Sequence, residues 1–292
     1  MSISQDIINT LKNAGVDLFA TLPCDKAKVL YSMVSKNFLE VPLSREEEGV
    51  GICAGAYLAG AKPAMLIQSA GVGNMVNALC SLTKVYKLPL LILVSWRGIY
   101  EEKIPAHIPL GKNLPKILEA IDVGYRIVEN RKDIPLISEA AAEAYENNVI
   151  QTVLLSPKLW EAENVEAMSQ REFRKEGITL LNSRTCQPAL TRFEILEVVA
   201  TYLEEKVVVC NLGIPCKELY QIKHQKSNFY MLGSMGLASS IGLGVSLFTK
   251  KNVVVIDGDG SLLMNLGALS TIARMKPRNL TIIAIDNGVH GS

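Results

Sequence analysis

The sequence lacks the charge pattern and the long apolar runs that would point to a large or extended partner. Among 292 residues, 30 Lys and Arg nearly balance 29 Asp and Glu, which leaves a formal charge of +1. This balance does not favour binding to nucleic acid or to a membrane surface. No apolar run is long enough to span a bilayer, and residues 1–14 lack the regions of a signal peptide. We therefore expect a cytoplasmic protein that acts on a small molecule.

The sequence is also poor in the residues that build zinc and disulfide sites. It has only three histidines, and its six cysteines include no Cys-x-x-Cys pair. Cysteines in apolar surroundings are typical of a reduced core, so neither zinc nor disulfides are expected. The sequence has no internal repeat. The cysteines are Cys24, Cys53, Cys80, Cys186, Cys210 and Cys216.

Apolar residues make up 49% of the chain, enough for two buried cores at this length. Short apolar runs alternate with segments of helical periodicity, which predicts parallel sheets covered by helices. The alternation is interrupted by a charged, irregular stretch, which we interpret as a linker. The sequence therefore predicts two α/β domains without a middle domain, with residues 1–160 in the first, 161–187 in the linker and 188–292 in the second.

One stretch of the second domain carries a recognisable ligand pattern. The apolar run 253–256 predicts a buried strand, and Asp257-Gly258-Asp259-Gly260-Ser261 follows it directly. Asn287 follows the next predicted strand, 280–285, after a helix expected over 262–275. Carboxylate and amide oxygens suit Mg²⁺, and glycines allow a diphosphate to approach the backbone. An alternative interpretation is an acidic helix N-terminus with no ligand.

In the first domain, the segment Ser44-Arg45-Glu46-Glu47-Glu48-Gly49 opens a predicted helix over 45–59. One interpretation is purely structural, with Ser44 as N-cap and Glu47 three residues later in a capping box. The other is catalytic, with Glu47 acting on a ligand. The helix continues through many Gly and Ala residues, which predicts that another element packs closely on it.

Together these patterns resemble the thiamine-diphosphate enzymes. Gly258-Asp259-Gly260 with Asn287 is similar to the diphosphate fingerprint of that family, and Glu47 ten residues before Tyr57 is similar to its pyrimidine-domain glutamate. The absence of a middle domain resembles the phosphonopyruvate and sulfopyruvate decarboxylase family, with alpha-like and beta-like parts fused. Two further segments carry the resemblance: Gln68-Ser69-Ala70-Gly71-Val72-Gly73-Asn74 and Gly233-Ser234-Met235-Gly236.

The resemblance implies a role for each matching residue. Glu47 would hydrogen-bond the pyrimidine N1′, Met235 would support the bent cofactor, and the Gly233 carbonyl would accept from the 4′-amine. Mg²⁺ would be held by Asp259, Asn287 and the carbonyl of Val289. The remaining residues expected to contact thiamine diphosphate are Ser69, Gly71, Gly73, Asn74, Ser234, Gly258, Gly260 and Ser261.

Candidate substrate and proton-transfer residues follow from the chemistry of an acidic substrate. Arg97 and Lys112 could bind its anionic groups, although Arg97 could equally form an ion pair. His107 and His290 could transfer protons, although a histidine in a loop is often only solvated.

The resemblance implies decarboxylation of a 2-oxo acid with a second anionic group, 3-sulfopyruvate in coenzyme M biosynthesis or, alternatively, phosphonopyruvate. It also implies a homodimer or homotetramer with active sites between subunits. The family's second domain continues beyond Asn287, so we expect that this domain is truncated here, and a non-catalytic fragment stays an alternative. A nicotinamide-dependent dehydrogenase is disfavoured, because strand 16–22 is not followed by Gly-x-Gly-x-x-Gly.

Overall fold

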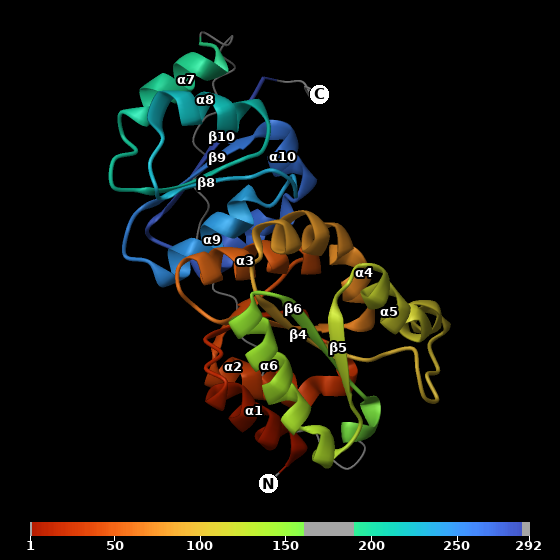
Figure 1. Ribbon diagram of the computed structural model, residues 1–292. Coiled ribbons are helices and arrows are strands. Elements are labelled where there is room, and N and C mark those ends of the chain that lie inside the picture. The colour runs from red at the N-terminus through yellow and green to blue at the C-terminus, as the bar shows by residue number, and fades with distance from the viewer. Residues whose placement is uncertain (1, 161–189, 288–292) are drawn as a thin grey trace.

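The computed structural model describes residues 2–160 and 190–287, which form two α/β domains (Figure 1). Each domain is built on a sheet whose strand pairs are all parallel within the described residues. The predicted fold class is therefore confirmed. The predicted linker, residues 161–187, lies outside the described residues, so the domain boundaries stay predictions.

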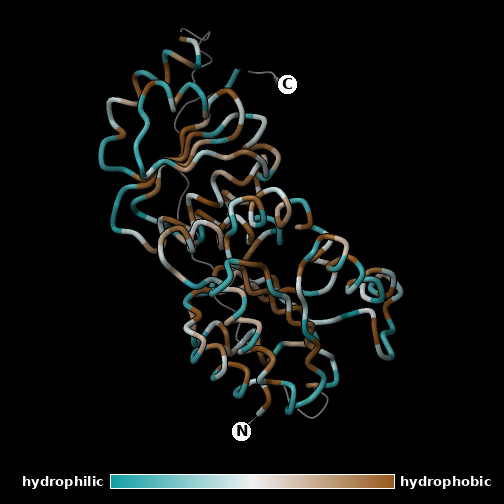
Figure 2. The backbone as a smooth tube through the Cα atoms, viewed as in Figure 1, coloured by the Kyte–Doolittle hydropathy of each residue, from teal (hydrophilic) through white to brown (hydrophobic). Residues whose placement is uncertain are grey.

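The first sheet has six strands in the order β2-β1-β3-β4-β6-β5. Its central strands β3, β4 and β6 are almost wholly buried, as expected for apolar runs covered on both faces. Figure 2 shows these strands as a hydrophobic band through the middle of the domain. The strands are β1 (Leu18–Thr21), β2 (Leu39–Pro42), β3 (Pro63–Gln68), β4 (Leu90–Ser95), β5 (Gly124–Val128) and β6 (Ile150–Leu155).

Helices cover both faces of this sheet. One apolar cluster joins α1, α2 and α6 to one face, and a second cluster covers the other face, where α3, α4 and α5 lie. The helices are α1 (Ile3–Asn13), α2 (Lys28–Asn37), α3 (Glu46–Leu58), α4 (Ser69–Ala78), the π-helix η2 (Leu79–Lys84), α5 (Ile108–Ala120) and α6 (Pro135–Asn147).

The described part of the second domain has a four-stranded sheet in the order β10-β9-β7-β8. Helices α7 and α8 share an apolar cluster with one face, and α9 packs on the other. Its elements are α7 (Arg192–Ala200), β7 (Val207–Cys210), α8 (Ile214–Lys223), β8 (Asn228–Tyr230), α9 (Ala238–Phe248), β9 (Val253–Gly258), α10 (Asp259–Met264), α11 (Gly267–Met275) and β10 (Leu280–Ile285).

The two domains repeat one topology although the sequence shows no repeat. The order β8-β7-β9-β10 corresponds to β2-β1-β3-β4, so α9 after β8 is the counterpart of α3 after β2. These two helices pack face to face between the sheets (Figure 1), and one apolar cluster runs through both domains. The small-residue helix therefore has the close neighbour that its composition predicts.

The contact between α3 and α9 is symmetric down to individual glycines. A Cβ atom on Gly55 would stand 2.8 Å from the Val245 nitrogen, and one on Gly244 would stand 2.8 Å from the Ala56 nitrogen. No side chain fits at either position, because each helix backbone lies directly on the other. Gly55 and Gly244 therefore occupy equivalent places in two related helices.

The predicted helix over 262–275 is two helices, which corrects the sequence interpretation. α10 ends at Met264, and α11 begins at Gly267 after a break at Asn265 and Leu266. Gly267 lies against Ser44 of the first domain, where a side chain would collide with the Ser44 hydroxyl. The break thus lets the second domain approach the start of α3. No helix among the described residues could cross a membrane.

Candidate cofactor site

A cavity of about 280 Å³ opens in the second domain. It lies at the carboxyl ends of β7, β9 and β10, where parallel α/β sheets usually bind ligands. Its walls contain Met235, Asn287 and the whole segment predicted to hold a diphosphate. The lining residues are Arg192, Asn211, Leu212, Gly213, Ile214, Pro215, Met235, Asp257, Gly258, Asp259, Gly260, Ser261, Ile285 and Asn287.

The sheet register explains how Asp259 and Asn287 come to line the same cavity. Ile285 of β10 pairs with Gly258 of β9, so the residues that follow these strands leave the sheet at neighbouring points. Two predicted metal ligands therefore share one wall of the cavity. Val289, the third predicted ligand, and His290 lie outside the described residues.

Two buried oxygens in this cavity have no hydrogen-bond partner among the described residues. They are Oδ2 of Asp257, whose residue is 2% exposed, and Oδ1 of Asn211, which is 6% exposed. Burial raises the pKa of the Asp257 carboxyl, and hydrogen bonds from Ser261 and from the Gly258 N–H act in the opposite direction. Orphaned buried acceptors are costly unless a ligand satisfies them. The cavity wall therefore fits a bound cation or a group that donates hydrogen bonds.

The donor set also fits Mg²⁺ held together with a diphosphate. Within the two described ranges, no three His, Cys, Asp or Glu side chains gather into a metal site of their own. Asp259 and Asn287 would supply two oxygen ligands, and Mg²⁺ in such sites takes its remaining ligands from phosphates and water. A metal site made by protein and cofactor together is consistent with this cavity.

The three consecutive glutamates of α3 have three different environments. Glu46 is buried and accepts a hydrogen bond from Nδ2 of Asn74 at 3.0 Å. Glu48 is fully buried, and its Oε1 accepts from the Ser44 backbone, the Ser44 hydroxyl and Oγ1 of Thr271. Glu47 is half-buried, and no hydrogen bond or ion pair to it occurs among the described residues. Of the three, Glu47 is thus the one with its carboxyl available.

This arrangement corrects the predicted capping box. The N-cap of α3 is Arg45, and Glu48 at position N3 accepts from the Arg45 and Ser44 backbone nitrogens. Helix capping therefore uses Glu48, one residue later than the sequence interpretation placed it. The structural explanation for Glu47 is removed, and its catalytic role stays a prediction.

Helix geometry gives the side of α3 on which Glu47 lies. Residues four apart share a helix face, so Glu47 lies on the same side as Gly51. Gly51 packs against α9, where a Cβ on it would stand 2.8 Å from the Ser240 Cβ. One turn earlier, Glu47 lies beyond the N-terminal end of α9. The segment Gly233–Gly236 precedes that end of the helix.

The segment that begins at Ser69, the first turn of α4, shapes the surroundings of the glutamates. A Cβ on Gly71 would stand 2.6 Å from Oε1 of Glu46, so glycine at this position leaves room for that carboxyl. The Ser69 hydroxyl is buried and accepts a hydrogen bond from the Arg97 nitrogen at 2.8 Å. Gly73 and Asn74 are exposed. Direct contact of these four residues with the cofactor stays a prediction.

The predicted pyrimidine segment is tied to the diphosphate loop. The Gly236 nitrogen donates to the buried hydroxyl of Ser261 at 3.0 Å, while Met235 lines the cavity. Ser234 is buried, and its backbone has φ of +57°. The two motifs that the sequence places 25 residues apart therefore form one continuous surface.

Of the residues predicted to bind substrate, Arg97 already has a partner. Its guanidinium forms two hydrogen bonds with Glu102, and both side chains are 6% exposed. Glu102 also accepts from the Gly98 and Ile104 nitrogens, so the pair fixes the loop after β4. Lys112 is exposed on α5, and His107 is half-buried at the start of that helix. Their substrate and proton-transfer roles stay predictions.

Replacing Glu102 by Gln is expected to lower the free energy of unfolding by about 3 kcal/mol, because it leaves the buried charge of Arg97 without the opposite charge of Glu102. Hydrogen bonding to Arg97 lowers the pKa of Glu102 from 4.5 to about 2. A carboxyl with a lowered pKa stabilises the fold fully above pH 4.5 and loses that contribution as pH falls toward 2. Urea unfolding at pH 7 and pH 3 measures both effects.

Glu101→Gln is the matched control, since Glu101 is the exposed neighbour. We expect it to unfold at the same urea concentration as the wild type at both pH values. Equal stability of the Glu102→Gln and Glu101→Gln variants would contradict the structural role of the ion pair.

Sequence reasoning missed several residues of the cavity, above all Asn211, and it gave Asp257 no role of its own. Asn211 follows β7 as Asp259 follows β9. A search for polar residues at the carboxyl end of every predicted strand would therefore have found Asn211. Arg192 also lines the cavity, and its guanidinium is paired with Glu218. Nothing in the local sequence connects Arg192 with this cavity.

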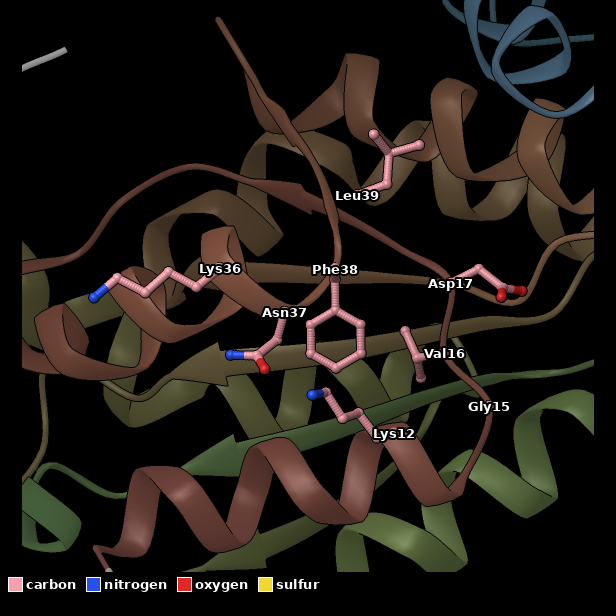
Figure 3. Close-up of a pocket in the computed structure, with 8 residues that line it drawn as sticks. All are labelled: Lys12, Gly15, Val16, Asp17, Lys36, Asn37, Phe38 and Leu39. Atoms are coloured by element: carbon pink, nitrogen blue, oxygen red, sulfur yellow. The ribbon is translucent and has the colours of Figure 1, made fainter.

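A second pocket, of about 580 Å³, lies in the first domain (Figure 3). It is at the amino ends of β1 and β2, so it is unrelated to the predicted cofactor residues. Its lysines are exposed, and Asp17 already accepts from the Lys62 nitrogen. The lining residues are Lys12, Gly15, Val16, Asp17, Lys36, Asn37, Phe38 and Leu39.

Comparisons with known proteins agree with the arrangement of the site. The thiamine pyrophosphate enzyme N-terminal TPP binding domain matches residues 1–120, and the C-terminal TPP binding domain matches residues 213–292. A putative thiamin diphosphate-dependent enzyme from Mycobacterium smegmatis superposes over 100% of this chain and 90% of its own, with a TM-score of 0.73 and 12% identity. That likeness concerns the fold alone.

Among curated relatives, sulfopyruvate decarboxylase of Methanosarcina acetivorans is 49% identical over 99% of this chain and 76% of its own length. Phosphonopyruvate decarboxylase of Streptomyces viridochromogenes is 32% identical over 98% of this chain and 74% of its own. Sulfopyruvate decarboxylase of Methanococcus maripaludis has separate subunits. Its alpha subunit matches 55% of this chain at 37% identity, and its beta subunit matches 35% at 50%. Those matches cover 98% of the alpha subunit and 56% of the beta subunit.

Two parallel-sheet domains with this cavity and these domain matches define a protein built to bind thiamine diphosphate. The alpha and beta subunits of the archaeal relative correspond to its two halves. The chain belongs to the family of thiamine pyrophosphate enzymes that includes the sulfopyruvate and phosphonopyruvate decarboxylases.

Proposed function

We propose that this chain is a carboxy-lyase that converts 3-sulfopyruvate to sulfoacetaldehyde and CO₂, a step of coenzyme M biosynthesis. The observation that carries the proposal is the cavity in which Asp259, Asn287 and the Gly258–Ser261 loop meet. The name of the relative with 49% identity supports 3-sulfopyruvate as the substrate. The five described cysteines are free thiols, which supports a reducing compartment such as the cytoplasm.

Different residues of the chain would bind different parts of the cofactor. Asp259 and Asn287 would bind Mg²⁺, and the loop Gly258–Ser261 would face the diphosphate. When bound, thiamine diphosphate supplies the electron sink for the carbanion left by loss of CO₂. Glu47 would hold a proton between its carboxyl and the pyrimidine N1′, which is the general acid-base role that we assign to it.

We further propose that two copies of the chain are needed for one active site. All residues that line the cavity belong to the second domain, and Glu47 is not among them. A second copy would cover the open cavity and exclude water from it. A homodimer or homotetramer with active sites between subunits would meet this requirement.

Phosphonopyruvate is the second candidate substrate, supported by the relative that is 32% identical. Both acids present a 2-oxo acid and a second tetrahedral anion, so the same cationic donors suit either. Because Arg97 is paired with Glu102, we assign Arg97 a structural role in the loop after β4. Lys112 is exposed and stays a candidate for binding the second anionic group of the substrate.

The test is a direct comparison of substrates with thiamine diphosphate and Mg²⁺ present. Release of CO₂ and of aldehyde is followed with 3-sulfopyruvate, phosphonopyruvate and pyruvate, the last as the control without a second anion. We expect kcat/KM for 3-sulfopyruvate to exceed both others by about 100-fold, which is the effect of one well-paired anionic group. Preference for phosphonopyruvate would assign the second candidate, and activity on none of the three would refute the proposal.

A further inference from the structure

The segment from Met231 to Leu237 lies between β8 and α9 and has neither helical nor strand structure. It contains Gly233, whose carbonyl is expected to accept from the pyrimidine 4′-amine. A carbonyl in such a segment keeps its direction only if other residues hold the backbone. The direction of the Gly233 carbonyl therefore depends on the side chains that contact this segment.

Two side chains of the first domain bond to this segment or to the residue before it. Oη of Tyr86 donates to the Tyr230 carbonyl at 2.7 Å, and the hydroxyls of Ser81 and Ser234 are 2.6 Å apart. Within the second domain, the Met231 nitrogen donates to the Cys210 carbonyl and the Gly236 nitrogen donates to the Ser261 hydroxyl. The Ser81 contact is the one beside Gly233.

The Ser81 contact coincides with backbone strain. Ser234 has φ of +57°, a left-handed conformation that is unfavourable for a non-glycine residue and persists only where the surroundings enforce it. Ser234 is 4% exposed, so its hydroxyl depends on a protein partner. The hydroxyl of Ser81 is that partner among the described residues.

Ser81 also touches Gly233 directly. A Cβ on Gly233 would stand 2.9 Å from both the Cβ and the carbonyl oxygen of Ser81. The backbone of Gly233 therefore packs directly against Ser81, which leaves no space for this backbone to move toward Ser81. Contact with Gly233 and a hydrogen bond to Ser234 together restrain the peptide between those two residues, and that peptide includes the Gly233 carbonyl.

The local fold that presents Ser81 is itself unusual. Ser81 lies in the π-helix η2, which continues α4 without a break. Wide π turns are rare and often occur where a helix must present residues at a functional site. The Thr83 hydroxyl donates to the Ala78 carbonyl five residues earlier, which helps to satisfy the widened turn.

We propose that Ser81 is a positioning residue for the cofactor reaction, one that fixes the Gly233 carbonyl through its contact with Gly233 and its bond to Ser234. It acts from the first domain of the same chain. The inference rests on the proposed function, because the Gly233 carbonyl matters only if a pyrimidine binds there.

The test compares wild type, Ser81→Ala, Ser234→Ala and the double variant with thiamine diphosphate and Mg²⁺ bound. The decisive readout is the rate at which the proton on C2 of the bound cofactor exchanges for deuterium. We expect Ser81→Ala to slow this exchange and to lower kcat about tenfold, the size of effect for one hydrogen bond. Affinity for thiamine diphosphate should change less than about threefold, because the diphosphate cavity is untouched.

The double variant should behave like Ser81→Ala alone, since both changes remove the same bond. Ser35→Ala is the matched control, because the Ser35 hydroxyl also bonds within its own helix region but lies on α2. An exchange rate in Ser81→Ala equal to that of wild type would overturn the inference. If Ser81→Ala unfolds, additive effects of Ser234→Ala and Tyr86→Phe on exchange would support the anchored segment, and no effect of either would overturn it.

The proposed function and this inference fail in different ways. Failure of the wild-type chain to bind thiamine diphosphate overturns both. Binding and decarboxylation by the wild type, with unchanged exchange in Ser81→Ala, overturns the inference alone.

Discussion

Replacing Glu47 by Gln is expected to lower kcat by about 10²–10⁴-fold, the range for loss of a general acid-base group. Gln occupies the same space but cannot carry the proton that the pyrimidine N1′ would share. Because Glu47 makes no hydrogen bond or ion pair within residues 2–160 and 190–287, the substitution should leave the folded chain intact. Affinity for thiamine diphosphate should fall less than about tenfold, because the cavity of the second domain is unchanged.

Glu48→Gln provides the matched control on the same helix turn. Glu48 is fully buried and joins the N-terminus of α3 to Thr271 of α11, so this variant should unfold more easily, by about 1–2 kcal/mol. We expect its kcat, measured at a temperature where it is folded, to stay within about tenfold of wild type. Thermal unfolding and single-turnover CO₂ release separate the two variants.

The opposite pattern would contradict this assignment of roles. If Glu48→Gln lost activity while Glu47→Gln kept it, the catalytic carboxyl would be Glu48. If Glu47→Gln bound no cofactor at all, Glu47 would serve binding and its acid-base role would be unsupported.

Long apolar runs made most of the fold predictable. The predicted strand 280–285 matches β10, and the predicted strand 253–256 lies within β9. The run in β9 is buried, and both segments contain few polar residues, so their type is unambiguous. The parallel arrangement followed from the helices between them.

Two of the four outer strands of the described sheets, β5 and β8, were missed for the same physical reason. β5 is mostly exposed or half-buried, and β8 is half-buried along its whole length. A strand at the edge of a sheet needs no continuous apolar run, so sequences such as Gly124–Val128 resemble a loop. Composition alone therefore misses an edge strand that lacks an apolar run, whereas β10, also outermost in the described sheet, has such a run and was predicted.

The cofactor site was predictable where local sequence determines it. Asp259 and Asn287 follow strands, and the Gly258–Ser261 loop is contiguous, so their meeting follows from the βαβ unit. Contacts between distant segments were not predictable. The bonds of Ser81 to Ser234 and of Glu48 to Thr271 join residues more than 150 positions apart, and neither side chain signals its partner.

Charge alone also proved a poor guide to function. Arg97, at the end of an apolar strand, had the features of a substrate-binding cation, yet its guanidinium is held by Glu102. The partner is five residues away in a loop, where no periodicity indicates which side chains meet. A buried cation needs such a partner, and the sequence does not say whether protein or ligand provides it.

Replacing Asp259 by Ala is expected to weaken Mg²⁺-dependent binding of thiamine diphosphate by at least about 100-fold. Asp259 is the carboxylate that shares the cavity wall with Asn287, and the metal would link it to the diphosphate. Without Asp259, Mg²⁺ would be bound less well. The negative diphosphate would then face the carboxyl of Asp257 with less positive charge between them. Isothermal titration with thiamine diphosphate, with and without Mg²⁺, measures the change.

Asp286→Ala is the matched control, because Asp286 precedes Asn287 at the same edge of the sheet but does not line the cavity. Asp286→Ala removes the same charge as Asp259→Ala. If only long-range electrostatics mattered, both variants would bind thiamine diphosphate equally weakly. A metal ligand acts differently, because its loss removes a bond at about 2 Å and not only a charge. Equal affinities of Asp259→Ala and Asp286→Ala would therefore exclude Asp259 as a ligand, whereas a large difference confined to solutions with Mg²⁺ would establish it.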